Sequence, residues 1–183
     1  GKEGEFAALE SMGVNERDGL VPLIEVPGVP YDHAKEEDAK TIDAHLNGLG
    51  SRVKKAWRDG ALMLDLRQCE TLVVADGRNA LSVALADCAA NAVDVRPVVT
   101  TFCCDEYKAA ATAFLALGGP SGVCVRLLPD NFDEDRDLHT DLDDLLGELR
   151  VRPAAVDLLV DQISLSDDRS TNVQLTRARF QAI

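Results

Sequence analysis

Aromatic side chains, histidine and long apolar runs are all scarce in this sequence of 183 residues. Phe, Trp and Tyr together make up 4% of it, so aliphatic side chains must fill any core. The absence of both a signal-peptide pattern and an apolar run of about 20 residues predicts no membrane span. Basic residues are outnumbered by acidic ones, 19 to 32, and the net charge of −13 repels a nucleic-acid backbone. We therefore expect a cytoplasmic protein with no general nucleic-acid binding and no membrane association.

The cysteines and histidines lack the spacing of a disulfide framework or a metal site. The five cysteines are an odd number without a CxxC pair, and the three histidines have no partner at ligand spacing. Residues 133–137 have the acid spacing of a calcium loop, but Leu138 replaces the required glycine and Asp144 the usual glutamate. We expect reduced thiols, no metal and no cofactor, with Thr140 as the cap of the helix that follows this loop.

Short apolar runs alternate with amphipathic segments along the whole chain. Runs that are apolar throughout, with helices between them, are typical of parallel strands buried on both faces. The expected strands are residues 20–26, 61–67, 95–102, 122–128 and 155–163. The expected helices are residues 3–12, 36–57 with a break at Gly48 or Gly50, 80–91 capped by Asn79, 105–117 and 140–150, with another starting near Asn172.

This alternation predicts an α/β fold that closes in one of two ways. An open doubly wound sheet needs a glycine-rich phosphate loop after an early strand, and none is present. A (β/α)8 TIM-type barrel has eight strands in about 250 residues. We therefore expect residues 1–183 to form a single α/β domain, an incomplete (β/α)8 barrel that lacks its first strand and its C-terminal strands.

Polar side chains stand at the ends of these otherwise apolar strands. In a parallel barrel the carboxyl ends of the strands form the ligand-binding face. Asp65 and Arg67 are two residues apart, which places them on one face of their strand. The candidate ligand-binding residues from all of the strand ends are Glu25, Asp65, Arg67, Arg126, Asp161 and Gln162.

Two interpretations of these charges remain open. Charges in buried strands are costly unless they are paired, so the side chains should meet one another or a ligand. In the first interpretation they form an ion-pair layer that fills the mouth of the barrel, with Arg67 bonded to Glu25 or Asp65. In the second, the arginines bind a small anionic ligand while a carboxylate acts as a general base. The sequence does not identify a catalytic residue.

The N-terminal third resembles a known family. The segments that carry the resemblance are GKEGEFAAL, LVPLIEVP, DAKTIDAHL, KKAW and ALMLDLR, which together span about residues 1–67. They are similar to the bacteriophage beta-protein family, whose members begin with an extra strand and a turn that would end at Gly1 and Lys2. The resemblance implies a barrel of roughly twice this length, found in phages, prophages and bacteria and associated with phage–host conflict. It transfers no catalytic residue.

The functional expectation follows from the resemblance and the strand ends together. We expect a protein of phage–host conflict or anti-phage defence that acts mainly by binding a protein partner. The alternative is a TIM-barrel enzyme that acts on a phosphate- or carboxylate-bearing small molecule at the C-terminal ends of the strands. An enzyme should leave an arginine or carboxylate unpaired in an open mouth. A binding protein should have a filled mouth and an apolar surface elsewhere.

Overall fold

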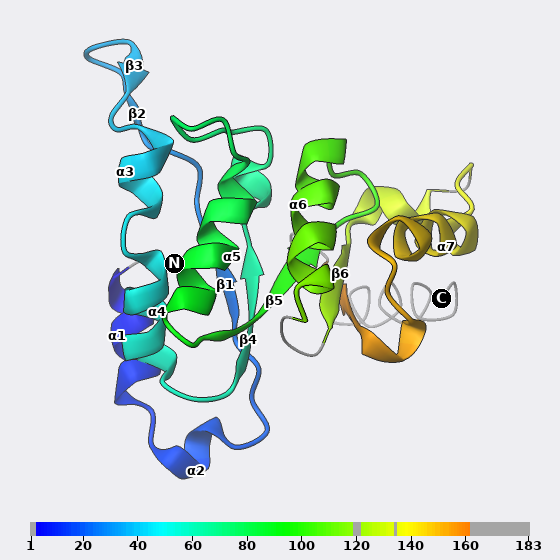
Figure 1. The fold of residues 1–183 in the computed structure, drawn as a ribbon, viewed down its shortest axis with the longest axis horizontal. Coiled ribbons are helices and arrows are strands. Elements are labelled where there is room, and N and C mark those ends of the chain that lie inside the picture. The colour runs from blue at the N-terminus through cyan, green and yellow to red at the C-terminus, as the bar shows by residue number, and fades with distance from the viewer. Residues whose placement is uncertain (1–2, 119–121, 134, 162–183) are drawn as a thin grey trace, which may run out of the picture.

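The computed structural model describes residues 3–118, 122–133 and 135–161, which form a parallel sheet covered by helices (Figure 1). Five strands lie in the order β1-β4-β5-β6-β7, which is their order along the chain, and every neighbouring pair is parallel. The predicted parallel sheet with helical crossovers is therefore confirmed. The strands are β1 (Leu23–Glu25), β4 (Ala61–Asp65), β5 (Asp94–Val99), β6 (Val123–Leu127) and β7 (Val156–Val160).

The sheet does not close on itself within the described residues. β1 and β7 are its two outer strands there, so the (β/α)8 barrel remains a prediction. Each strand is also shorter than its expected range: β1, for example, begins at Leu23 and ends at Glu25, and β4 ends at Asp65. The final helix expected near Asn172 and the last two residues of the fifth strand expectation lie outside the described part of the chain.

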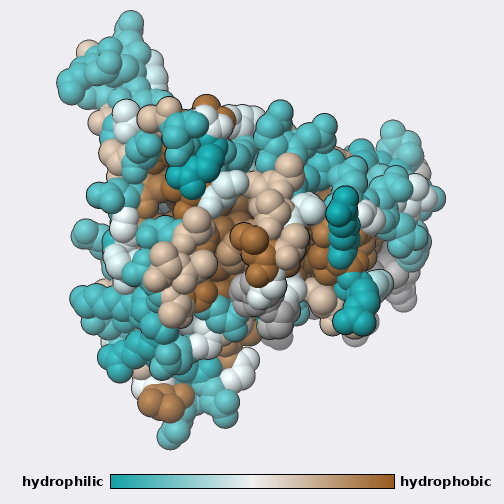
Figure 2. All heavy atoms as spheres, in the orientation of Figure 1, coloured by the Kyte–Doolittle hydropathy of each residue, from teal (hydrophilic) through white to brown (hydrophobic). Residues whose placement is uncertain are grey.

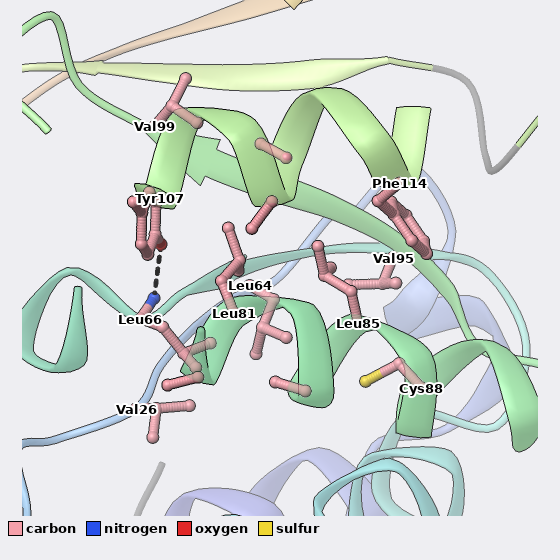
Figure 3. Packing of buried hydrophobic residues seen from close by; sticks show 14 of the residues in the cluster. Val26, Leu64, Leu66, Leu81, Leu85, Cys88, Val95, Val99, Tyr107 and Phe114 are labelled. Carbon is pink, nitrogen blue, oxygen red and sulfur yellow. Dashed lines mark hydrogen bonds between the residues drawn. The ribbon is translucent and has the colours of Figure 1, made fainter. Parts of the chain in front are cut away.

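Helices pack against one face of this sheet, and the core lies between the two layers. The register places Ile24, Leu64, Val95 and Val125 on the same face, where they join one apolar cluster. Figure 3 shows Leu81 and Leu85 meeting Leu64 and Val95 in this layer. The helices are α1 (Glu3–Ser11), α2 (Val14–Arg17), α3 (Ile42–Leu46), α4 (Leu49–Trp57), α5 (Ala80–Ala90), α6 (Asp105–Ala116) and α7 (Leu138–Leu149), with 3₁₀ turns η1 (Arg67–Cys69), η2 (Pro129–Phe132) and η3 (Pro153–Ala155).

Local capping explains where these helices begin. Asn79 caps α5 as predicted, because its side chain accepts a hydrogen bond from the Leu81 N–H at 2.8 Å. The break predicted at Gly48 is also present, since Gly48 adopts a left-handed φ of 65° directly before α4. The expected cap of α7 was wrong. Asp137 caps that helix by accepting from the Thr140 N–H at 3.2 Å.

A small hairpin replaces the start of the helix expected over residues 36–57. Its antiparallel strands are β2 (Tyr31–Asp32) and β3 (Glu37–Asp38). Asp32 holds the turn by accepting from the N–H groups of Ala34 and Lys35. The hairpin projects from the rest of the molecule (Figure 1), and its surface is almost entirely hydrophilic (Figure 2). Short polar strands of this kind leave no apolar pattern, so the sequence did not predict them.

A tyrosine separates β4 from β5 at their C-terminal ends. The register of the two strands, continued past Leu64 and Pro97, would join the Leu66 N–H to the Val98 carbonyl. Instead the hydroxyl of Tyr107 lies between them, accepting from Leu66 at 3.1 Å and donating to Val98 at 3.1 Å (Figure 3). Burial, with a contribution from the charge of Asp65, raises the pKa of Tyr107, so the hydroxyl keeps the proton that it donates.

Replacing Tyr107 with Phe should destabilise the protein by about 1–3 kcal/mol, because a buried N–H and a buried carbonyl lose their partner. The free energy of unfolding in urea measures this loss. Tyr31→Phe is the matched control, since Tyr31 is exposed and its ring lies edge-on to that of His33. Equal stability of the two variants would contradict the bridging role of the Tyr107 hydroxyl.

Candidate functional site

Arg126 is the centre of the polar side chains at the strand ends. It lies in β6, whose five residues are all buried, and it is only 8% exposed. Its Nε and Nη2 donate to Asp161 Oδ2 at 2.9 and 2.6 Å, its Nη1 donates to Asp65 Oδ2, and Glu25 Oε2 is 3.6 Å from Nη1. One guanidinium therefore faces three carboxyl groups, which come from β1, β4 and the residue after β7.

The register of the sheet brings these four side chains together. Glu25 pairs with Asp65 across β1 and β4. The Asp161 N–H continues the β6–β7 ladder by donating to the Leu127 carbonyl at 2.8 Å, which sets the carboxylate beside Arg126. All four lie on the sheet face opposite the helices. Burial disfavours the charge of Arg126, but the hydrogen bonds to Asp161 and Asp65 outweigh it and raise its pKa, so the guanidinium remains charged.

Both carboxylate oxygens of Asp65 are engaged. Asp65 is 1% exposed; its Oδ2 accepts from Arg126, and its Oδ1 accepts from the backbone N–H of Arg67 at 2.7 Å. With both oxygens bonded, this buried carboxylate serves mainly as the hydrogen-bond acceptor of the Arg126 guanidinium and the Arg67 N–H. The sequence correctly predicted that Asp65 would meet an arginine, but the guanidinium that it binds is that of Arg126.

Arg67 contacts Asp65 through its main chain, and the predicted bond from its side chain to Glu25 or Asp65 is not present. β4 ends at Asp65 and Arg67 begins the turn η1, so the alternation that would keep both side chains on one face is lost. The Nε of Arg67 is buried without a hydrogen-bond partner in the described structure. The pKa of nearby Glu70 is raised overall, chiefly by burial. The positive charge of Arg67 opposes this shift, and the negative charge of Asp65 adds to it.

Two amides that the sequence did not single out complete the strand ends. Gln68 donates to Glu25 Oε1 at 3.1 Å and accepts from the Gly28 N–H at 3.0 Å, which ties the end of β1 to η1. Buried Asn131 donates to the Thr101 hydroxyl at 2.6 Å and accepts from the Leu128 N–H. Neither residue lies in an apolar run, so no sequence signal marked them. The remaining candidate, Gln162, lies outside the described residues.

A second ion pair lies on the same face of the sheet, nearer the amino-terminal ends of the strands. Arg96 of β5 bonds to Asp157 of β7, two residues that are not at strand ends and were not predicted as candidates. Buried Cys124 lies on the strand between them. Burial raises the pKa of its thiol to about 12, with the charges of Asp157 and Asp65 acting in the same direction and those of Arg126 and Arg96 opposing it. Cys124 is thus a protonated, unreactive thiol at neutral pH.

The described part of the chain contains no group of three or more His, Cys, Asp or Glu side chains arranged to hold a metal ion. Its five cysteines are all free, and four of them are buried. None of its helices is long and apolar enough to cross a membrane.

Replacing Arg126 with Met should cost about 3–5 kcal/mol of stability, because Asp65 and Asp161 are left at close range without a cation. The control is Arg67→Met, which removes no side-chain ion pair within the described structure and should cost much less. Chemical unfolding of the two variants beside the unsubstituted chain measures the difference. If Arg126→Met proves as stable as Arg67→Met, the carboxylates do not depend on this guanidinium.

Comparison with known proteins places the chain in a family. No curated protein and no solved structure matches it. A family model described as Beta protein matches residues 1–183, the whole chain. The resemblance detected in the first 67 residues thus extends over all of the strands that carry the Arg126 cluster. The chain belongs to the Beta protein family.

Proposed function

We propose that this beta-family protein acts in phage–host conflict or anti-phage defence, mainly by binding a protein partner. The observation that carries the proposal is the occupation of Arg126 by Asp65, Asp161 and Glu25. An arginine that binds a substrate anion must give up its carboxylate partners, and breaking buried pairs costs several kcal/mol. The cluster is better suited to holding strands together than to exchanging ligands.

The carboxyl groups of the cluster support the same conclusion. A general base needs an oxygen within reach of the proton that it removes. Asp65 has both oxygens occupied, and Asp161 Oδ2 receives two bonds from Arg126.

We propose further that the sheet is part of an incomplete (β/α)8 barrel. Its chain-order parallel strands, with helices on one face and these polar groups on the other, support that proposal.

An exposed apolar segment at the amino-terminal end of β1 supports binding. Leu20, Val21 and Leu23 are all exposed, and they occupy four consecutive positions with Pro22 at the start of β1. Scattered exposed apolar residues are ordinary in soluble proteins, whereas contiguous ones often mark an interaction site. A filled polar cluster and a contiguous apolar surface are the two features expected of a binding protein.

Phage challenge tests the proposal. Bacteria expressing the full chain should plate at least one phage of a diverse panel with altered efficiency, compared with cells that carry an empty vector. Glu25→Gln should not change this effect, because the amide oxygen still accepts from Gln68, and Arg126 keeps its hydrogen bonds to Asp65 and Asp161.

Two results would reject the proposal. An unchanged plating efficiency for every phage would remove the role in phage conflict. Loss of the effect in Glu25→Gln, at an unchanged level of folded protein, would show that a reactive carboxylate is needed and would favour the enzyme.

The alternative, a TIM-barrel enzyme for a phosphate- or carboxylate-bearing small molecule, is favoured by Arg67. Its Nε is buried without a hydrogen-bond partner among the described residues, although its charge acts on Glu70 in an acidic protein. A buried donor without a partner is uncommon and is often explained by an unseen ion or a functional role. A small anion would satisfy it.

Titration with inorganic phosphate tests this alternative. If Arg67 binds an anion, the unfolding midpoint should rise with phosphate concentration, and Arg67→Met should abolish the rise. Sodium chloride at equal ionic strength controls for screening, and Arg152→Met controls for the loss of one exposed positive charge. An equal phosphate response of the unsubstituted chain and Arg67→Met would exclude an anion site at Arg67.

A further inference from the structure

A hollow of about 280 Å³ lies between the carboxyl-terminal ends of α6 and α7, at the end of the sheet where β6 and β7 begin. Leu115 of α6, Leu149 of α7 and Val151 form its apolar floor. Two arginines, Arg150 and Arg152, line the same hollow. Figure 2 shows an apolar area where α6 and α7 adjoin, with hydrophilic side chains beside it. The hollow thus combines an apolar floor with a positively charged border.

The two arginines of the hollow have no carboxylate partner among the described residues, although acidic residues outnumber basic ones by 32 to 19 in the chain. Glu148 and Asp157 are the acidic residues nearest to them in the sequence on either side. Glu148 Oε2 lies 2.7 Å from Lys108 Nζ. Asp157 bonds to Arg96. Both arginines are exposed, so their guanidinium groups are available to a carboxylate from another molecule.

The backbone of Arg150 is unfavourable for any residue with a side chain. Arg150 ends α7 with a left-handed φ of 56° and ψ of 38°. Glycine is the usual residue at such a position, because a Cβ atom crowds the backbone there. An arginine at this helix end gains a favourable interaction with the last carbonyl groups of α7, which is the ordinary structural role for it. A role in binding and a role at the helix end predict different effects of Arg150→Gly.

Charge and exposed apolar area determine which occupant fits the hollow. Leu117 directly follows α6 and is 85% exposed, so the apolar area continues beyond the hollow itself. A small anion alone would pair with the arginines but leave the aliphatic side chains in water. A second copy of the chain would bring a further net charge of −13, which disfavours that occupant. A protein segment with an aliphatic side chain between carboxylates supplies both kinds of contact.

We propose that this hollow binds a segment of a partner protein in which an aliphatic side chain is flanked by acidic residues. The aliphatic side chain packs against Leu115, Leu149 and Val151. The flanking carboxylates bind the guanidinium groups of Arg150 and Arg152, since arginine pairs with carboxylates through charge-assisted hydrogen bonds. The inference rests on the proposed binding function and names its partner class.

Three labelled peptides test the inference by fluorescence anisotropy with the full chain. The first has a leucine between pairs of aspartates, the second a serine between pairs of aspartates, and the third a leucine between pairs of asparagines. The aspartate–leucine peptide should bind saturably and about tenfold or more tighter than the other two, because it alone supplies both the charge and the apolar side chain. The overall charge of the chain predicts the reverse, since it repels aspartates. Aspartate–leucine binding that is absent, or no tighter than that of either other peptide, would overturn the proposal.

Matched arginine variants locate the site. Arg150→Gly should weaken binding of the aspartate–leucine peptide about tenfold or more. Its unfolding midpoint should be at least that of the unsubstituted chain, because glycine accepts the left-handed backbone. The control Arg58→Gly removes an exposed arginine that ends α4 with a φ of 57° and does not line the hollow, so it should leave binding unchanged.

A lower unfolding midpoint with unchanged peptide binding in Arg150→Gly would assign this arginine to the helix end and overturn the proposal. If the midpoint and the binding fall together, Arg152→Gln decides, because Arg152 lies outside α7 and its side chain makes no capping hydrogen bond. Weaker peptide binding by Arg152→Gln supports the site, and unchanged binding overturns it.

The remaining outcomes separate this inference from the proposed function. Displacement of the peptide by inorganic phosphate, beyond that by sodium chloride at equal ionic strength, would identify a small anion as the occupant and overturn the partner class. A dimer in sedimentation analysis that Arg150→Gly dissolves would overturn it in favour of a second copy. A phage effect that survives in Arg150→Gly, with peptide binding lost, would overturn the hollow as the functional surface but leave the proposed function standing. Peptide binding as expected, with no phage effect, would support the hollow and reject the role in phage conflict.

Discussion

A guanidinium in the middle of a fully buried strand is the constraint on which the sheet depends. Arg126 cannot be solvated by water within β6, so carboxylates must reach it from the strands on either side. Glu25, Asp65 and Asp161 do so only if β1, β4 and β7 are parallel to β6 and end at the same level. The ion cluster thus selects both the strand order and the register, which a purely aliphatic sheet would define less sharply.

The two faces of the sheet contribute differently to folding: one supplies most of the stability, and the other favours one arrangement of the strands. Aliphatic residues such as Leu64, Val95 and Val125 bury their area beneath the helices, and this burial supplies most of the driving force for folding. The opposite face carries Arg126 and Arg96 with their carboxylates. Ion pairs of this kind add little net stability over apolar side chains, but they penalise any arrangement that leaves a charge unpaired.

The sequence predicted the features that leave a local pattern. Apolar runs and amphipathic segments identified the strands, and their alternation gave a parallel order. Strand-end polarity identified Asp65, Arg126, Glu25 and Asp161 as a group. The choice between Arg67 and Arg126 depends on where β4 stops, which is set by the insertion of Tyr107 beside Leu66, forty-one positions away. Contacts at such separation leave no trace in a window of the sequence.

The pairing of Arg96 with Asp157 was missed for the same reason. Each residue lies within its strand, and only the register across β5, β6 and β7 brings them together. The β2–β3 hairpin was missed for the opposite reason, since its few polar residues bury nothing and their pairing depends on one turn. Sequence reasoning therefore worked best where burial is periodic, and failed where a single contact decides the geometry.

The same hairpin has a consequence for how this protein can diversify. None of residues 31–38 belongs to the apolar cluster or contacts Arg126, and the segment projects beyond the sheet. Insertions, deletions and sequence drift between Pro30 and Thr41 can therefore accumulate without moving the ion cluster or the core. In a lineage under rapidly changing selection, this hairpin can therefore change in length and chemistry while the fold persists.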